Sequence, residues 1–291
     1  MNNVPETSPP GPLATKESGR KPLKFSRGWI TRPVFGVLLA AIAIGALYKG
    51  GFYFALFIAV VIITAAREWH RMIAEGRFTE EFLVTSLVVI VGVCTEVAAP
   101  GTIWPWAIIA LGAIVSFALA SLRNRLAFWE AGGVLYLGIP ALSVVMLRIL
   151  PAGGFRLLLT FFISIWATDT GALIFGNLIG GPKLWPALSP NKTWAGFFGG
   201  ILLAAIAGGV AFAIMQLGAG RGALFAASVG VIAHMGDLFE SWAKRSFRIK
   251  NSGGLIPGHG GVLDRVDSTL LAAPALAVVV LLAGINPVVL P

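Results

Sequence analysis

Charged residues are scarce in this sequence. They make up 12% of its 291 residues, against about 25% in typical soluble domains, while hydrophobic residues make up 57%. This composition excludes an ordinary soluble domain and predicts an integral membrane protein. Cysteine is almost absent: Cys94 stands alone in an apolar run, so we expect a buried hydrophobic side chain and no internal disulfide.

The few charges are mostly basic and give a net charge of +9. Nucleic acid is not the expected partner, because the basic residues are interrupted by apolar segments and do not form one solvated face. Anionic lipid and phosphate suit this distribution better. Residues 1–28 are basic and rich in proline, with too little apolar content to fold alone, and are expected to form a disordered cytoplasmic tail.

The apolar segments predict an all-α bundle of about nine transmembrane helices. A span needs about 20 mostly apolar residues. We expect five spans in residues 29–150 and four, carrying the polar motifs, in residues 151–291. The nine candidates are 33–49, 51–66, 82–99, 103–121, 131–150, 156–180, 194–217, 221–243 and 268–289.

The basic residues also predict an orientation. With nine spans, 18 of the 22 Lys and Arg fall on the side of the N-terminus and 4 on the other. The positive-inside rule then places the N-terminus in the cytoplasm. The connections that carry polar motifs are expected on the same side, and a bacterial inner membrane is the preferred location.

Aspartate is rare as well, and all four aspartates lie in or beside apolar stretches of the C-terminal half. An ionised carboxylate at membrane depth costs about 2.5–3.5 kcal/mol, so such residues usually have a function. Asp264 and Asp267 are three residues apart and would share a face of a helix starting near Val262. With Asp237 they could hold a divalent cation; alternatively, the pair only caps that helix.

Two further acids have competing interpretations. Glu240 follows Asp237 by three residues, and the default expectation is an ion pair with Lys244 one turn later. Asp169 is expected about 20 Å into its helix from Arg156, near mid-membrane. It would either face a wet cavity with a catalytic role or make a polar contact between helices.

The segment before Asp264 combines glycine with basic residues. Gly260 and Gly261, with other glycines from 253 onward, allow backbone amides to approach an anion. Beside the basic residues of 244–250, this pattern indicates a polyphosphate site. His259 is either a base or phosphate donor, or a structural loop residue.

A second polar cluster precedes the span at 194–217. Ser189, Pro190, Lys192 and Thr193 open this helix, which makes an oxyanion site at its N-terminus plausible. The alternative for Lys192 is an ordinary basic loop residue on the cytoplasmic side.

These motifs resemble the phosphatidate cytidylyltransferases, also called CDP-diacylglycerol synthases. The signature of that family reads Ser-x-x-Lys-Arg, four residues, Lys-Asp, then Pro-x-His-Gly-Gly, two residues and Asp-Arg-x-Asp. Eleven positions match with the same spacing: Ser241, Lys244, Arg245, Lys250, Pro257, His259, Gly260, Gly261, Asp264, Arg265 and Asp267. Upstream, Asp169 and the segment from Ser189 to Gly196 are similar too. Three positions depart from the family pattern: Asn191, Ala195 and Asn251.

The resemblance implies that phosphatidic acid attacks the α-phosphorus of CTP, releasing pyrophosphate and leaving CDP-diacylglycerol in the bilayer. It implies Mg²⁺ on Asp237, Asp264 and Asp267, with a second ion left open. The negative charge of the phosphates that the ion leaves would be neutralised by Lys244, Arg245, Lys250 and Arg265. Ser189 and Lys192 would hold either the lipid phosphate or the pyrophosphate end.

Other functions stay open at this point. They are a catalytically impaired relative, suggested by Asn251 and Ala195, a CTP-dependent lipid-alcohol kinase, and an ion-coupled transporter. A homodimer is a further expectation, although no stripe in the sequence identifies a pairing helix.

Overall fold

Helices dominate the structure, a computed structural model that describes residues 28–151, 153–253 and 260–283. Within these residues the helices are α1 (Gly28–Lys49), α2 (Gly51–Ile73), α3 (Glu80–Ala98), α4 (Trp104–Leu122), α5 (Ala127–Ile149), α6 (Gly154–Leu178), α7 (Trp194–Ile214), α8 (Ala219–Ser246) and α9 (Leu263–Ala283). The eight helices α2 to α9 are each long and apolar enough to cross a membrane. The predicted all-α membrane bundle is therefore confirmed.

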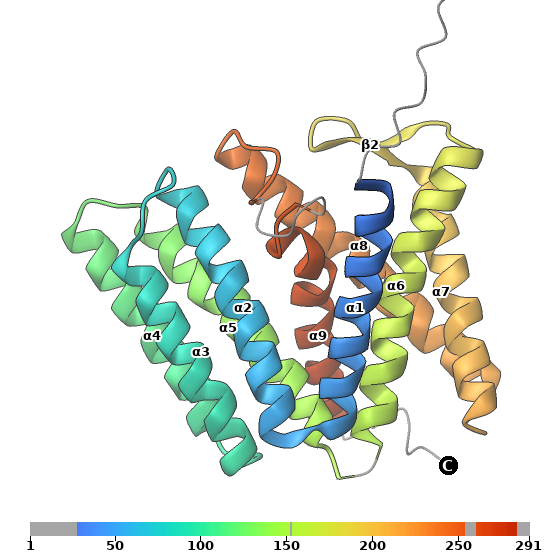
Figure 1. Ribbon diagram of the computed structural model, residues 1–291, viewed down its shortest axis with the longest axis horizontal. Coiled ribbons are helices and arrows are strands. Elements are labelled where there is room, and N and C mark those ends of the chain that lie inside the picture. The colour runs from blue at the N-terminus through green and yellow to red at the C-terminus, as the bar shows by residue number, and fades with distance from the viewer. Residues whose placement is uncertain (1–27, 152, 254–259, 284–291) are drawn as a thin grey trace, which may run out of the picture.

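The helices form two groups joined by α9 (Figure 1). Helices α2 to α5 pack together on one side, and α6 to α8 on the other. Helix α1 contacts α2 and α6, whereas α9 contacts α8, α5 and α2. The last helix of the chain is thus held by both groups.

Glycine allows the close approach of α6, α7 and α8. A Cβ at Gly171 of α6 would lie 2.6 Å from the carbonyl oxygen of Gly199 of α7, and one at Gly208 of α7 2.5 Å from that of Gly222 of α8. Between membrane helices, small residues provide the van der Waals packing that hydrophobicity cannot supply, because lipid is equally apolar. Larger side chains at these positions would push the helices apart.

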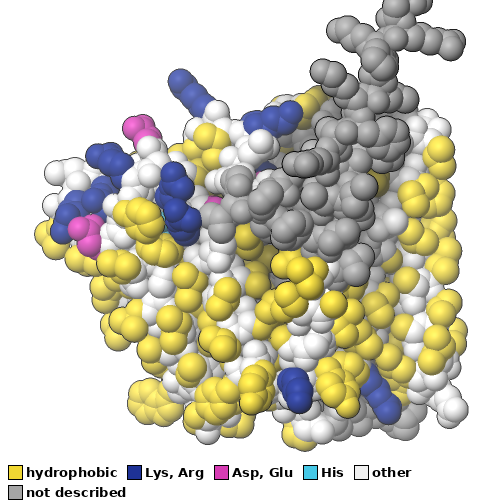
Figure 2. Space-filling view, in the orientation of Figure 1, with side chains coloured by type: hydrophobic (Ala, Val, Ile, Leu, Met, Phe, Trp, Pro, Cys, Tyr) yellow, Lys and Arg dark blue, Asp and Glu magenta, His cyan; other side chains and the backbone are white. Residues whose placement is uncertain are grey.

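Polar connections gather at one end of the bundle. Figure 1 shows the connections α2–α3, α4–α5, α6–α7 and α8–α9 at the upper end. Most visible charged side chains lie there, while hydrophobic side chains cover the flanks (Figure 2). Such a surface fits a protein whose flanks face lipid.

The connection from α6 to α7 is more ordered than the loop that the sequence suggested. It forms an antiparallel hairpin of β1 (Lys183–Trp185) and β2 (Ser189–Thr193), in which Lys183 pairs with Thr193. Thr193 then caps α7, since its Oγ1 accepts a hydrogen bond from the amide of Gly196 at 3.1 Å. The expected start of this helix at 194 is confirmed.

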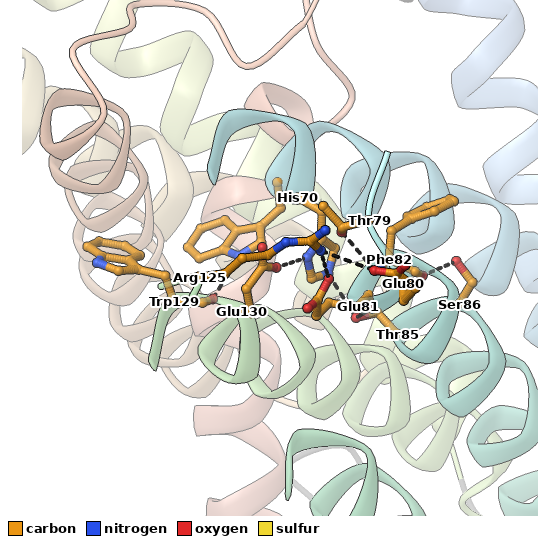
Figure 3. A network of polar contacts seen from close by, with 11 residues as sticks. His70, Thr79, Glu80, Glu81, Phe82, Thr85, Ser86, Arg125, Trp129 and Glu130 are labelled. Atoms are coloured by element: carbon orange, nitrogen blue, oxygen red, sulfur yellow. Dashed lines mark hydrogen bonds and ion pairs between the residues drawn. The ribbon is translucent and has the colours of Figure 1, made fainter. Parts of the chain in front are cut away.

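The N-terminal group contains a buried polar network, drawn in Figure 3. The His70 side chain of α2 contacts the Glu130 carboxylate of α5 through Nδ1, and its Nε2 lies 2.8 Å from Oγ1 of Thr85 of α3. Arg125 reaches Glu81 of α3 at 2.7 Å. From the sequence these helices were expected only as hydrophobic spans, yet polar and charged side chains connect three of them, α2, α3 and α5.

Candidate active site

Carboxylates from three helices converge on one cavity of about 300 Å³ near the polar end of the bundle. Asp169 comes from α6, Asp237 and Glu240 from α8, and Asp264 and Asp267 from α9. The cavity is lined by Asp169, Asp237, Glu240, Lys244, Lys250, Asn251, Asp264, Arg265, Asp267 and Ser268. Residues almost 100 positions apart in the chain thus line the same polar cavity.

The closest carboxylates are those of Asp237, Glu240 and Asp267, each with an oxygen within 4.8 Å of the others. Asp237 and Glu240 are three residues apart on α8 and thus share one face, which meets Asp267 of α9. Glu240 is almost fully buried, and its Oε1 has no hydrogen-bond partner among the described residues. An oxygen-only group with an unpartnered buried oxygen fits a hard cation such as Mg²⁺.

Asp264 belongs to the same cavity but has other partners. Its Oδ1 lies 2.7 Å from Nζ of Lys244, and its Oδ2 accepts a hydrogen bond from the amide of Gly261 at 3.2 Å. Lys244 also lies 2.7 Å from Glu240, as expected for this pair on one helix. Lys244 therefore connects Asp264 with the close group of acids, and a role of Asp264 as a metal ligand stays a prediction.

The β-hairpin contributes a cation to the site. Lys192 of β2 forms an ion pair with Asp237 of α8. Ser189, at the other end of β2, is half-buried and does not line the cavity. The segment from Ser189 to Thr193 thus approaches the acids through Lys192, although the two clusters are far apart in the sequence.

The basic residues divide into two sets. Lys250 and Arg265 line the cavity and are exposed, so they lie at its rim. Arg245 instead donates hydrogen bonds to the carbonyl oxygens of Leu188 at 3.4 Å and Ile249 at 2.9 Å. It ties the end of α8 to the β-hairpin.

The amides at the start of α9 are engaged by carboxylates. The amide of Gly261 donates to Asp264, and those of Val262 and Leu263 donate to Glu68 of α2. Gly260 has a φ of 81°, which explains a glycine there, since other residues rarely adopt this conformation. His259 lies outside the described residues, and phosphate binding by the glycine segment stays a prediction.

Sequence reasoning missed three features of this site. It treated Glu240 mainly as an ion-pair partner of Lys244, although its spacing from Asp237 already suggested a shared face. It did not identify Ser268 as a residue lining the cavity. It also missed Glu68 of α2, which accepts hydrogen bonds from the start of α9; an acid near the end of an apolar helix was the only local signal.

The chain is similar in sequence to known proteins. A family model described as "Cytidylyltransferase family" matches residues 30–283. A phosphatidate cytidylyltransferase of Brucella suis biovar 1 is 35% identical over 248 residues, which are 84% of this chain and 91% of the relative. One from Staphylococcus epidermidis is 33% identical over 263 residues, covering 86% of this chain and 98% of the relative. Another, from Staphylococcus haemolyticus, is 31% identical over 258 residues, with the same two shares.

Proposed function

The chain belongs to the cytidylyltransferase family, and from this membership we propose that it transfers the CMP moiety of CTP to phosphatidic acid. The products are CDP-diacylglycerol, which stays in the bilayer, and pyrophosphate. The observation that carries the proposal is the cavity in which five carboxylates and three cationic side chains meet among membrane helices. An integral membrane enzyme with such a site can bring an anionic lipid head group to a nucleotide.

Mg²⁺ is the cofactor that the acidic residues support best. Asp237, Glu240 and Asp267 would hold it, because their oxygens lie within 4.8 Å of one another. When bound, the ion supplies Lewis-acid polarisation of phosphate oxygens and neutralises part of the triphosphate charge. Lys244 would support this set from one side, since it forms ion pairs with both Glu240 and Asp264.

The remaining phosphate charge would fall to the cationic side chains. Lys250 and Arg265 line the rim of the cavity and suit the triphosphate of CTP. Lys192, next to Asp237 from the β-hairpin side, suits either the lipid phosphate or the departing pyrophosphate. These positive charges stabilise a transition state in which negative charge spreads over phosphoryl oxygens.

The reaction itself is a phosphoryl substitution. An oxygen of the lipid phosphate forms a bond to the α-phosphorus of CTP, and the bond from that phosphorus to the bridging oxygen of the β-phosphate breaks. A phosphate monoester has a second pKa of about 6, so the lipid phosphate is largely dianionic at pH 7 and needs no base to attack. Bringing two anions together is the main difficulty, and the cations of the site address it.

The membrane orientation follows from charge. The cavity lies near the end where the polar connections gather, and we place this end in the cytoplasm of a bacterial inner membrane. The support is that, with nine spans, the sequence is expected to place 18 of its 22 Lys and Arg on the side of these connections. CTP would then enter from the cytoplasm, while the acyl chains of the lipid stay in hydrocarbon.

Product analysis tests the function. Detergent-purified protein would be incubated with CTP, Mg²⁺ and phosphatidic acid in mixed micelles, with Asp267→Asn as the inactive control. We expect equal amounts of CDP-diacylglycerol and pyrophosphate. A lipid-alcohol kinase would give CDP and a phosphorylated lipid. A transporter would release no pyrophosphate. A catalytically impaired relative would form no CDP-diacylglycerol.

A further inference from the structure

Glu68 lies near the end of α2 and is 3% exposed. Its Oε2 accepts hydrogen bonds from the amide of Leu263 at 2.8 Å and from Oγ of Ser252 at 3.1 Å. Its Oε1 accepts from the amide of Val262 at 3.1 Å. Both carboxylate oxygens are thus bonded to the start of α9 and the segment before it, almost 200 residues downstream.

This arrangement is a helix cap supplied by another helix. The first amides of a helix have no partner within the helix, and the helix dipole favours negative charge there. Hydrogen bonds from these amides to an ionised carboxylate are shorter and stronger than those between neutral groups. Glu68 therefore fixes the position of the first turn of α9, which carries Asp264 and leads directly to Asp267.

Two glycines make room for the Glu68 carboxylate. A Cβ at Gly253 would lie 2.5 Å from its Oε1, and a Cβ at Gly261 would lie 2.5 Å from its Oε2. Neither glycine has a positive φ, so space and not backbone conformation requires glycine at these positions. Part of the glycine content before Asp264 thus serves contact with the protein's own carboxylate.

The end of α2 is itself held firmly. Trp69 donates from Nε1 to the carbonyl oxygen of Trp129 on α5 at 3.2 Å. His70 contacts Glu130 of α5 and Thr85 of α3, as Figure 3 shows. Since successive helix residues are about 100° apart, residues 68 to 70 face three different neighbours of α2.

We propose that Glu68 is a positioning residue for the metal-binding turn: the N-terminal helices hold its carboxylate, and the carboxylate holds the start of α9. The inference rests on the proposed Mg²⁺ site of Asp237, Glu240 and Asp267. Glu68 does not line the cavity, so it acts through the backbone of α9 and touches neither substrate nor metal. This role gives the N-terminal half of the chain a part in the reaction that hydrophobic spans alone would not have.

Glu68→Gln is the informative substitution. The side chain keeps its shape, but the amide group can accept only at its oxygen, and its NH₂ would face a backbone N–H. We expect the Mg²⁺ concentration for half-maximal activity to rise about 10- to 100-fold, the range seen when groups that orient metal ligands are lost. Glu68→Asp keeps the charge and should recover part of this loss. The matched control is Glu96→Gln, which changes another buried carboxylate, on α3, outside the cavity lining and outside the contacts that hold the end of α2.

Two measurements are independent of turnover. Mn²⁺ affinity, determined by electron paramagnetic resonance on the purified protein, should fall in Glu68→Gln by the same factor and stay unchanged in Glu96→Gln. Hydrogen exchange of residues 260–268 should accelerate only in the Glu68 variant. If Glu68→Gln fails to fold, Gly253→Ala replaces it, because the added methyl group displaces the same carboxylate and should give the same change in Mn²⁺ affinity.

The outcomes separate the two proposals. In one outcome, the wild-type protein forms CDP-diacylglycerol, and Glu68→Gln leaves the Mg²⁺ dependence and the Mn²⁺ affinity unchanged. This result overturns the positioning role and supports the proposed function. An equal loss in Glu96→Gln would also overturn it, because the effect would then be general destabilisation. Wild-type protein that binds Mn²⁺ but makes no CDP-diacylglycerol overturns the function, and the positioning role is then decided by Mn²⁺ affinity.

Discussion

Glu240 offers the sharpest test of the active site. The sequence alone predicts a mild effect for Glu240→Gln, because an ion pair with Lys244 accounts for the acid. In the structure, one oxygen of Glu240 contacts Lys244 at 2.7 Å, while the other is buried without a hydrogen-bond partner among the described residues. That second oxygen is available for a cation shared with Asp237 and Asp267.

The structure separates the effect on stability from the effect on catalysis. Lys244 would keep its contact with Asp264 at 2.7 Å, so it would not be left as an unpaired buried charge. We therefore expect a stability loss of about 1.5–3 kcal/mol, typical of one hydrogen bond to a charged group. Loss of a group that only orients a metal ligand lowers activity by up to about 100-fold. Loss of a direct ligand should lower activity by at least this factor, which corresponds to an increase of ~2.7 kcal/mol in the activation free energy.

The assay is CDP-diacylglycerol formation in mixed micelles at a series of Mg²⁺ concentrations. Glu240→Gln should lower kcat and raise the Mg²⁺ requirement, and the thermal midpoint shows whether the protein is folded. The control is Glu96→Gln, another almost fully buried acid, located on α3 and outside the cavity lining. An unchanged Mg²⁺ requirement with a raised KM for CTP would refute the reasoning, because Glu240 would then act only through Lys244.

Three further predictions concern the acidic site and the cap of α7. Asp267→Asn should lower CDP-diacylglycerol formation more than 100-fold in the same assay, a loss of at least about 2.7 kcal/mol, with a thermal midpoint near that of the wild type; full activity would contradict the metal assignment. Removal of divalent ions with a chelator should abolish activity, and Mg²⁺ but not Na⁺ should restore it; activity that persists after dialysis against the chelator would exclude the ion. Thr193→Ala should cost about 1 kcal/mol of stability, measured by thermal unfolding, through loss of the cap on Gly196; Thr193→Ser is the control, and equal loss in both variants would argue against the cap.

Much of the fold could be predicted from local patterns. Runs of about 20 apolar residues indicate spans because backbone polar groups in lipid must be satisfied within a helix. The nine predicted segments correspond to the nine helices of the described chain, with shifts of a few residues at most ends. The largest shift is at the end of α2, which continues to Ile73 and not only to 66. Helix α9 begins at Leu263, close to the expected start near Val262, so Asp264 and Asp267 lie on the helix as predicted.

The polar residues of the C-terminal half were also recognisable, because charge in an apolar segment is costly and therefore conspicuous. Asp169, Asp237, Asp264 and Asp267 were all singled out from the sequence, and all four line one cavity. Their chemical roles stay predictions. The β-hairpin was not predicted, since its strands are short and contain a proline and several polar residues.

The sequence by itself determined that this chain is a membrane helix bundle and which of its rare acids and bases are candidates for phosphate chemistry. Only the tertiary structure decided which carboxylates come within 4.8 Å of one another, that Lys192 reaches Asp237, and that Glu68 holds the start of α9. The physical reason is that hydropathy and helical spacing act between neighbours in the chain. Contacts between helices depend on how their side chains and glycines pack, and no local pattern encodes that arrangement.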